Sequence, residues 1–198
     1  MYEAVVMGLS AGGMNVLKTI IPALPATFPL PIAIVQHIAP SSDGYLAEYL
    51  GQISAIPVKE AEDKEILRGG TAYLAPAGYH LLIEANRTFS LSIDESVNYC
   101  CPSIDVLFDS AADVYRQNLI GIVLTGANAD GSKGLKKIKE GGGLAIVQDP
   151  LTAEVPYMPQ AALNATVIDY ILDVSQIAPL LARLGKVGEG ENNVRSIS

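Results

Sequence analysis

Four short apolar runs that do not alternate with polar residues constrain the fold of this chain most strongly. Strands that are apolar at successive positions are buried on both faces, which is typical of a parallel sheet covered by helices. The runs are Ala4–Met7, Ile32–Val35, Leu119–Leu124 and Leu144–Val147. The sequence therefore predicts an α/β fold, in which a single doubly wound, mostly parallel sheet is flanked by helices.

Helical spacing of apolar residues predicts the flanking layers. Met14, Leu17 and Ile21 recur at i, i+3 and i+7, and Pro22 ends that helix. The other predicted helices are about Ser103–Arg116, Gly131–Glu140 and Val174–Leu184. The third of these stops at a run of three glycines, which is a natural helix terminator.

The middle and the end of the chain follow other patterns. Leu81–Glu84 and Thr88–Ile93, joined by Ala85-Asn86-Arg87, predict an antiparallel β-hairpin that extends beside the main sheet. After Gly185 the chain is rich in Gly, Glu, Asn and Ser. We therefore expect one α/β domain over residues 1–185 and a disordered tail over residues 186–198.

Composition excludes several classes of protein. With 198 residues, of which 49% are hydrophobic and 17% charged, the chain forms a core and is not disordered as a whole. A formal net charge of −8 argues against a broad nucleic-acid interface. Lysines cluster in one predicted helix, where they favour a solvated face over a patch that docks an acidic partner; they are Lys133, Lys136, Lys137 and Lys139.

Localisation and redox context are also constrained. The uncharged stretch Thr19–Ser42 is broken by Pro22, Pro25, Pro29 and Pro31 and cannot be a membrane helix, so we expect no membrane insertion. The first residues show no basic signal-peptide region, which favours a cytoplasmic protein. Cys100 and Cys101 are adjacent and do not indicate a disulfide framework.

The turn after the first apolar run carries a candidate nucleophile. Ser10 lies in Gly8-Leu9-Ser10-Ala11-Gly12-Gly13, whose glycines allow a sharp strand-to-helix bend that exposes the hydroxyl. Taken alone, the motif also fits a glycine turn that cradles a phosphate. A dinucleotide site, however, would need an acidic residue about 20 positions on, and none lies near Phe28–Ile32.

Two further polar residues follow other strand ends. His37 follows the second apolar run and Asp130 follows the third, so with Ser10 they can converge at the carboxyl edge of the sheet as a Ser-His-Asp triad. Asp149 follows the fourth run and is the alternative acid. We expect His80, the other histidine, to pack or to cap a turn. As alternatives to catalysis, Asp130 would cap the next helix and Asp149 would shape the turn before Pro150. The order Ser…His…Asp differs from that of α/β-hydrolases.

Taken together, several segments closely resemble the catalytic domain of CheB-type chemotaxis receptor methylesterases. The matching segments are Gly8–Gly13, Val35–His37, Ala75–His80, Pro102–Phe108, Leu124–Gly131, Gln148–Pro150 and Met158–Ala162. The resemblance implies hydrolysis of glutamate γ-methyl esters on the cytoplasmic helices of chemoreceptors, with glutamine deamidation in many members. It also implies Ser10, His37 and Asp130, rather than Asp149, as the triad, and no metal or organic cofactor. Backbone N–H groups of Ala11 and Ala127 are then expected to stabilise the oxyanion.

The sequence departs from the family pattern at several positions, and these departures motivate alternatives to an active, phosphorylation-controlled esterase. Ala11 stands where threonine is common, Ala127 where methionine is common, and Cys101 where an arginine is common. These changes motivate a second hypothesis, a catalytically weakened module that binds or scaffolds receptors. Well-known members carry an N-terminal receiver domain, whereas the first strand here begins near Glu3. We therefore expect a free-standing catalytic domain, either unregulated or controlled by a regulatory partner.

Overall fold

The main sheet is open and parallel. The computed structural model describes residues 1–38 and 44–186, and within them a seven-stranded sheet has the order β3-β4-β2-β1-β7-β8-β9 with every neighbouring pair parallel. The strands are β1 (Ala4–Leu9), β2 (Ile32–Gln36), β3 (Val58–Glu60), β4 (Ala72–Leu74), β7 (Leu119–Val123), β8 (Leu144–Gln148) and β9 (Tyr170–Leu172). The predicted fold class is confirmed.

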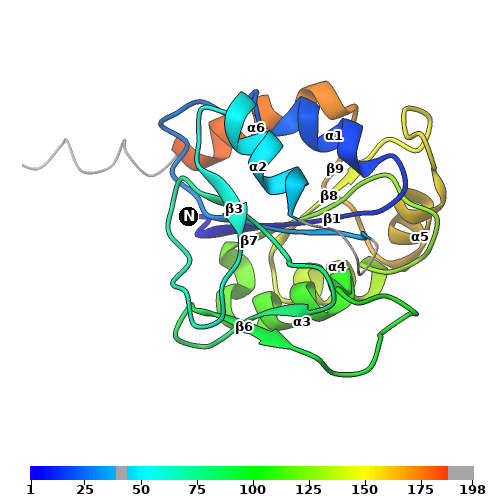
Figure 1. The fold of residues 1–198 in the computed structure, drawn as a ribbon. Helices are drawn as coiled ribbons and strands as arrows, with labels where there is room; N and C mark the ends of the chain where they lie inside the picture. Colours follow the sequence, from blue (N-terminus) through cyan, green and yellow to red (C-terminus); the bar gives the residue numbers. More distant parts are fainter. Residues whose placement is uncertain (39–43, 187–198) are drawn as a thin grey trace, which may run out of the picture.

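Helices cover both faces of this sheet. Figure 1 shows α1, α2 and α6 on one face and α3 and α4 on the other. The helices are α1 (Gly13–Ile20), α2 (Tyr45–Ile53), α3 (Ile104–Tyr115), α4 (Ser132–Glu140), α5 (Tyr157–Ala165) and α6 (Val174–Lys186), with a 3₁₀ turn at Arg116–Asn118. Within the described residues, none of these helices combines the length and apolarity needed to cross a bilayer.

The central strands contribute to two cores at once. In β1, Val5, Met7 and Leu9 pack in the core under α1, α2 and α6, whereas Ala4 and Val6 pack in the core under α3, α4 and α5. Successive side chains of a strand point to opposite faces, so a strand buried on both sides must be apolar throughout. This requirement explains the uninterrupted apolar runs of the sequence.

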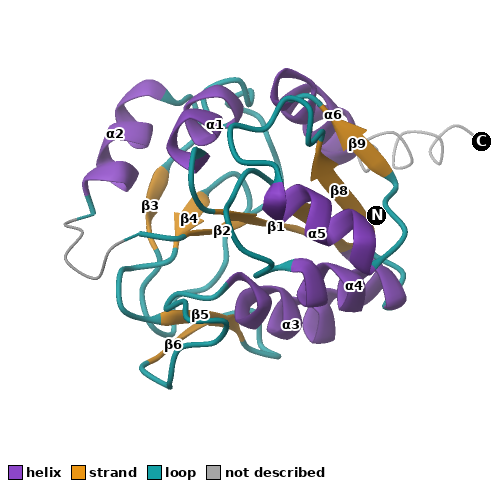
Figure 2. Cartoon of the chain, turned by 90° about the vertical axis from the view of Figure 1, so that its right-hand side faces the viewer, coloured by secondary structure: helices purple, strands orange, loops and turns teal. Residues whose placement is uncertain are grey.

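The predicted hairpin is confirmed as a separate two-stranded sheet. Strands β5 (His80–Ile83) and β6 (Phe89–Ser92) pair antiparallel and do not join the main sheet. Figure 2 shows them beside α3, at the edge of the molecule. Buried Leu81 and Phe89 attach this hairpin to the core under α3.

The four lysines of helix α4 are exposed or half-exposed, and Lys137 and Lys139 form ion pairs with side chains outside the helix. Lys137 lies 2.7 Å from Asp109 and 2.9 Å from Asp113, and Lys139 lies 2.5 Å from Asp169. Because the two Lys137 pairs are solvent-exposed, each contributes at most about 1 kcal/mol to stability.

Several elements were not predicted, and others have different ends. The missed elements are α2, β3, β4, α5 and β9. Three of them are strands of three residues, too short for a periodic pattern. The helix α5 contains Pro159 in its first turn, where the missing N–H has no helical acceptor anyway. The predicted strand Leu119–Leu124 ends at Val123, whereas β1 continues to Leu9. From residue 187 on, the expected tail lies outside the described residues.

Candidate active site

Ser10 lies on a tight turn between β1 and α1. Its N–H donates to the Thr125 carbonyl (2.9 Å), and its own carbonyl accepts from the Gly13 N–H (2.9 Å). Gly12 has a φ of 79°, a left-handed conformation that favours glycine. A Cβ on Gly126 would lie 2.9 Å from the Ser10 Cβ, so the neighbouring loop can approach only as glycine. The sharp bend predicted from the motif is present.

His37 is held next to Ser10 by the register of the sheet. Leu9 of β1 pairs with Gln36 of β2, and the His37 N–H donates to the Leu9 carbonyl (3.0 Å). The buried Gln36 amide donates to the carbonyls of Ser10 (2.8 Å) and His37 (3.0 Å). This role of Gln36 was not predicted, because a polar residue at a strand end carries no signal that its side chain connects two loops.

Asp130 forms the centre of the hydrogen-bond network. Its side chain is fully buried, and Oδ2 lies 2.9 Å from His37 Nε2. The remaining donors to this carboxylate are Asn98 Nδ2 (2.9 Å), Ser103 Oγ (2.9 Å) and the N–H groups of Ile104 (2.6 Å) and Asp105 (3.2 Å). Burial would raise the pKa of Asp130, but the hydrogen bonds, first that of His37, hold the pKa below its usual value. Asp130 is therefore an ionised acceptor.

Asp130 does not cap the helix that follows it, and the alternative of such a cap is wrong. The N-cap of α4 is Gly131, which has no side chain of its own to cap the helix. Instead, Asp130 accepts from the first N–H groups of α3, while Asp105 of α3 accepts from Gly131 N–H (2.9 Å) and Gly134 N–H (2.8 Å) of α4. Burial, together with the nearby charge of Asp130, raises the pKa of Asp105. This exchange of capping carboxylates fixes the two helix ends around the site.

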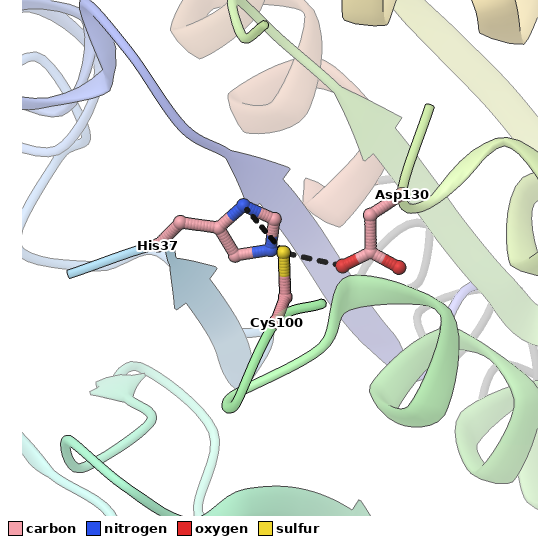
Figure 3. A group of neighbouring side chains, drawn as sticks. All are labelled: His37, Cys100 and Asp130. Atoms are coloured by element: carbon pink, nitrogen blue, oxygen red, sulfur yellow. Dashed lines mark hydrogen bonds and ion pairs between the residues drawn. The ribbon is translucent and has the colours of Figure 1, made fainter. Parts of the chain in front are cut away.

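The second ring nitrogen of His37 faces two other side chains, of which Figure 3 shows Cys100. Since an ionised carboxylate only accepts, Nε2 carries the proton that it shares with Asp130, and Nδ1 of the neutral ring presents a lone pair. Nδ1 lies 3.6 Å from Cys100 Sγ and 3.5 Å from Asn128 Nδ2. Among the described residues the Ser10 hydroxyl makes no hydrogen bond to this ring. A cavity of about 240 Å³ borders His37 and Cys100.

The two predicted oxyanion donors lie on loops at this edge of the sheet. Ala11 and Ala127 are both exposed. Within the described part of the chain, neither backbone N–H is taken by another protein group. The Thr125 hydroxyl donates to the Ala11 carbonyl (2.9 Å) and accepts from the Val155 N–H (2.9 Å), which fixes the loop.

The remaining candidates have structural roles. His80 is buried. Its Nδ1 accepts from the Ser103 N–H (3.1 Å), and its Nε2–H donates to the Glu95 carbonyl (3.2 Å). The Asp149 carboxylate accepts from the Leu151 N–H (2.9 Å), as a turn residue does. Neither contacts the His37–Asp130 pair among the described hydrogen bonds. Both cysteines are free.

An imidazole backed by an ionised carboxylate, beside a serine on a glycine turn, is typical of hydrolases that use a nucleophile and a general base. A model of the CheB methylesterase family matches residues 5–181. A protein from Leptospira interrogans is 57% identical over 183 residues, which cover 92% of this chain and 95% of that protein. The crystal structure of the Thermotoga maritima CheB methylesterase catalytic domain superposes with a TM-score of 0.89 at 38% identity, covering 93% of this chain and 99% of that one.

Longer relatives match as well. A Carboxydothermus hydrogenoformans protein named protein-glutamate methylesterase/protein-glutamine glutaminase 1 is 43% identical, and the match covers 91% of this chain and 54% of that protein. The chain belongs to the CheB methylesterase family and is an esterase of that class.

Proposed function

We propose that this chain hydrolyses glutamate γ-methyl esters on the cytoplasmic helices of chemoreceptors through Ser10, His37 and Asp130. The observation that carries the proposal is the His37–Asp130 pair at 2.9 Å, held by the sheet register beside the Ser10 turn. The names of the relatives support the ester and the amide as substrates. The chemoreceptor as the substrate is supported by the resemblance of the sequence to chemotaxis methylesterases.

In the first half of the reaction, Ser10 is acylated. His37 takes the hydroxyl proton at Nδ1 while Oγ attacks the γ-carbonyl carbon, and Asp130 stabilises the imidazolium through Nε2. The free N–H groups of Ala11 and Ala127 donate to the oxyanion of the tetrahedral intermediate. Collapse of this intermediate breaks the bond to the methoxy oxygen, which leaves as methanol with the proton from His37. The substrate must bring Oγ within reach of Nδ1, because such contacts often tighten only in the complex.

In the second half, water releases the product. His37 accepts a proton from water, whose oxygen attacks the acyl carbon, and the bond to Ser10 breaks as the proton returns to Oγ. The product is a glutamate carboxylate, which is one negative charge more than the ester carried. With a glutamine substrate the same steps would release ammonia in place of methanol.

The test is methanol release from methylated receptor fragments. Ser10→Ala should lower the rate by about 10⁴-fold or more, because the nucleophile is lost. Asp130→Asn should lower it by about 10⁴-fold, because the tautomer of His37 is no longer fixed. Asp149→Asn, the matched control, should keep the native rate. Undiminished release by Ser10→Ala would remove the nucleophile assignment, and receptor binding without any hydrolysis by the native chain would favour a scaffolding module.

A further inference from the structure

A thiol, an imidazole and a carboxylate meet at the proposed base. Figure 3 shows Cys100 beside the ring of His37, with Asp130 beyond it. One ligand atom from each of the three side chains lies within 4.8 Å of the others. Sulfur and imidazole nitrogen are the donors that zinc prefers in proteins. The proposed hydrolysis uses His37 and Asp130 but gives no role to Cys100.

The distance between the two soft donors fits a bound metal ion. With Zn–S of about 2.3 Å and Zn–N of about 2.0 Å, tetrahedral coordination separates sulfur from nitrogen by about 3.5 Å. The observed separation of Cys100 Sγ and His37 Nδ1 is 3.6 Å. The adjoining cavity of about 240 Å³, which both side chains line, provides room for water as a further ligand.

The hydrogen bond on the other side of the ring completes the pattern. Metal-bound histidines usually donate their second ring N–H to a carboxylate, which orients the ring and raises its basicity. Asp130 lies in this position, 2.9 Å from Nε2. We propose that this cluster binds a borderline-soft divalent cation, Zn²⁺ above all, with Cys100 Sγ and His37 Nδ1 as direct ligands and Asp130 as the partner that positions the ring.

In the metal-free protein, the Asn128 side chain lies next to both proposed ligand atoms. Its Nδ2 lies 3.3 Å from Cys100 Sγ and 3.5 Å from His37 Nδ1, so its N–H donors point at the atoms that would hold the cation. Its Oδ1 accepts from the Asp130 N–H (3.1 Å), a bond that a carboxylate at position 128 could equally accept. The cation must therefore displace this amide, and a carboxylate in its place should add a ligand.

Metal binding and hydrolysis exclude each other. An Nδ1 lone pair bound to a cation cannot accept the proton of Ser10 or of water, so zinc should inhibit the esterase. This inhibition rests on the proposed function, whereas the binding does not. The cluster thereby makes the esterase sensitive to thiophilic cations.

The binding test uses the adjacent cysteines as a matched pair. Metal-free native chain, Cys100→Ser and Cys101→Ser are titrated with Co²⁺, and the thiolate-to-cobalt charge-transfer band is followed before competition with Zn²⁺. Native chain and Cys101→Ser should show the band, and Cys100→Ser should lose it and bind zinc at least about 10-fold more weakly. Asn128→Asp should bind zinc more tightly than the native chain. A band that survives Cys100→Ser, or native chain without a band, would overturn the site, and unchanged affinity in Asn128→Asp would overturn its placement beside Asn128.

A second measurement needs no variant. Iodoacetamide alkylation of the native chain, resolved by fragment mass spectrometry, should be slowed by zinc at Cys100 and not at Cys101, and equal protection would contradict the proposal. Methanol release then tests the consequence, since zinc should inhibit the native chain and Cys101→Ser but not Cys100→Ser, each relative to its own metal-free rate. If the chain releases no methanol at all, the proposed function fails while the cobalt band still decides the metal site.

Discussion

At the scale of single residues, Asp130 shows how a buried charge is made tolerable. An isolated carboxylate in the interior would be protonated, because desolvation disfavours the charged form. Here the donors from His37, from Asn98 and from the first turn of α3 reverse that tendency, and the pKa of Asp130 is lowered. The same contacts fix which nitrogen of His37 carries the proton. Asp130 thereby contacts both the first turn of α3 and the proposed base His37.

This lowered pKa makes the stability of the protein depend on pH. The pKa of Asp130 lies below its usual value of 3.8 in the folded protein. Its stabilising contribution is therefore complete above the unfolded pKa and is lost as the pH falls through the folded pKa. Asp130→Asn should lower the free energy of unfolding by roughly 2–3 kcal/mol at neutral pH, and by much less in acid.

Urea unfolding of both proteins across the acid range measures this difference. The control is Asp149→Asn, whose carboxylate accepts one hydrogen bond in its turn and should lower the free energy of unfolding only slightly. A gap between native chain and Asp130→Asn that is equal at about pH 7 and about pH 3 would show that the charge contributes nothing.

At the scale of elements, the site is a meeting of strand ends and helix starts. Ser10, His37 and Asp130 each follow a buried strand, so the sequence pattern predicted them at one edge, while the choice of Asp130 over Asp149 came from the family resemblance. Asn98 and Ser103 escaped prediction, because a loop and a helix start over 25 residues away carry no sign of what they contact. The short strands escaped because three residues show no period. Sequence reasoning thus predicted the proposed triad, but not Asn98 and Ser103, which donate hydrogen bonds to Asp130.

The packing of α3 against β1 gives a prediction at this scale. A Cβ added to Gly8 would lie 2.2 Å from Ile104 Cγ2, so Gly8→Ala should cost about 1–3 kcal/mol of unfolding free energy through overpacking. In Gly8→Ala/Ile104→Ala the added methyl enters the space that Ile104 leaves. The double variant should therefore be more stable than the sum of the single effects by about 1 kcal/mol or more.

The matched control for this cycle is a helical glycine with room. At Gly51 in α2 the nearest atom to an added Cβ is the Val58 carbonyl at 3.4 Å, so Gly51→Ala should be neutral or stabilising by up to about 1 kcal/mol. Denaturant unfolding of the four proteins in the cycle gives the coupling energy. Strict additivity of Gly8→Ala and Ile104→Ala would mean that the backbone, rather than this side chain, absorbs the added methyl.

At the scale of the whole molecule, the two cores share one sheet and cannot unfold separately. Every central strand sends alternate side chains to opposite layers, as Val5 and Val6 of β1 do. Losing either helical layer would expose one face of strands whose other face remains packed. The described domain should therefore unfold in one cooperative transition. Proteins whose layers meet across a small interface can instead unfold in separate steps.

Core truncations on opposite faces test this cooperativity. Leu17 of α1 and Leu107 of α3 are fully buried in different cores, and replacing either by alanine should cost about 2–5 kcal/mol. Because the sheet couples the layers, either variant should move one common midpoint, seen equally by near-UV and far-UV circular dichroism. The two costs should add within about 0.5 kcal/mol, because the side chains do not touch. If Leu17→Ala moved the far-UV midpoint and left the near-UV midpoint in place, the two layers would unfold as separate units. The sheet would then not couple the stability of the core on one of its faces to that of the core on the other.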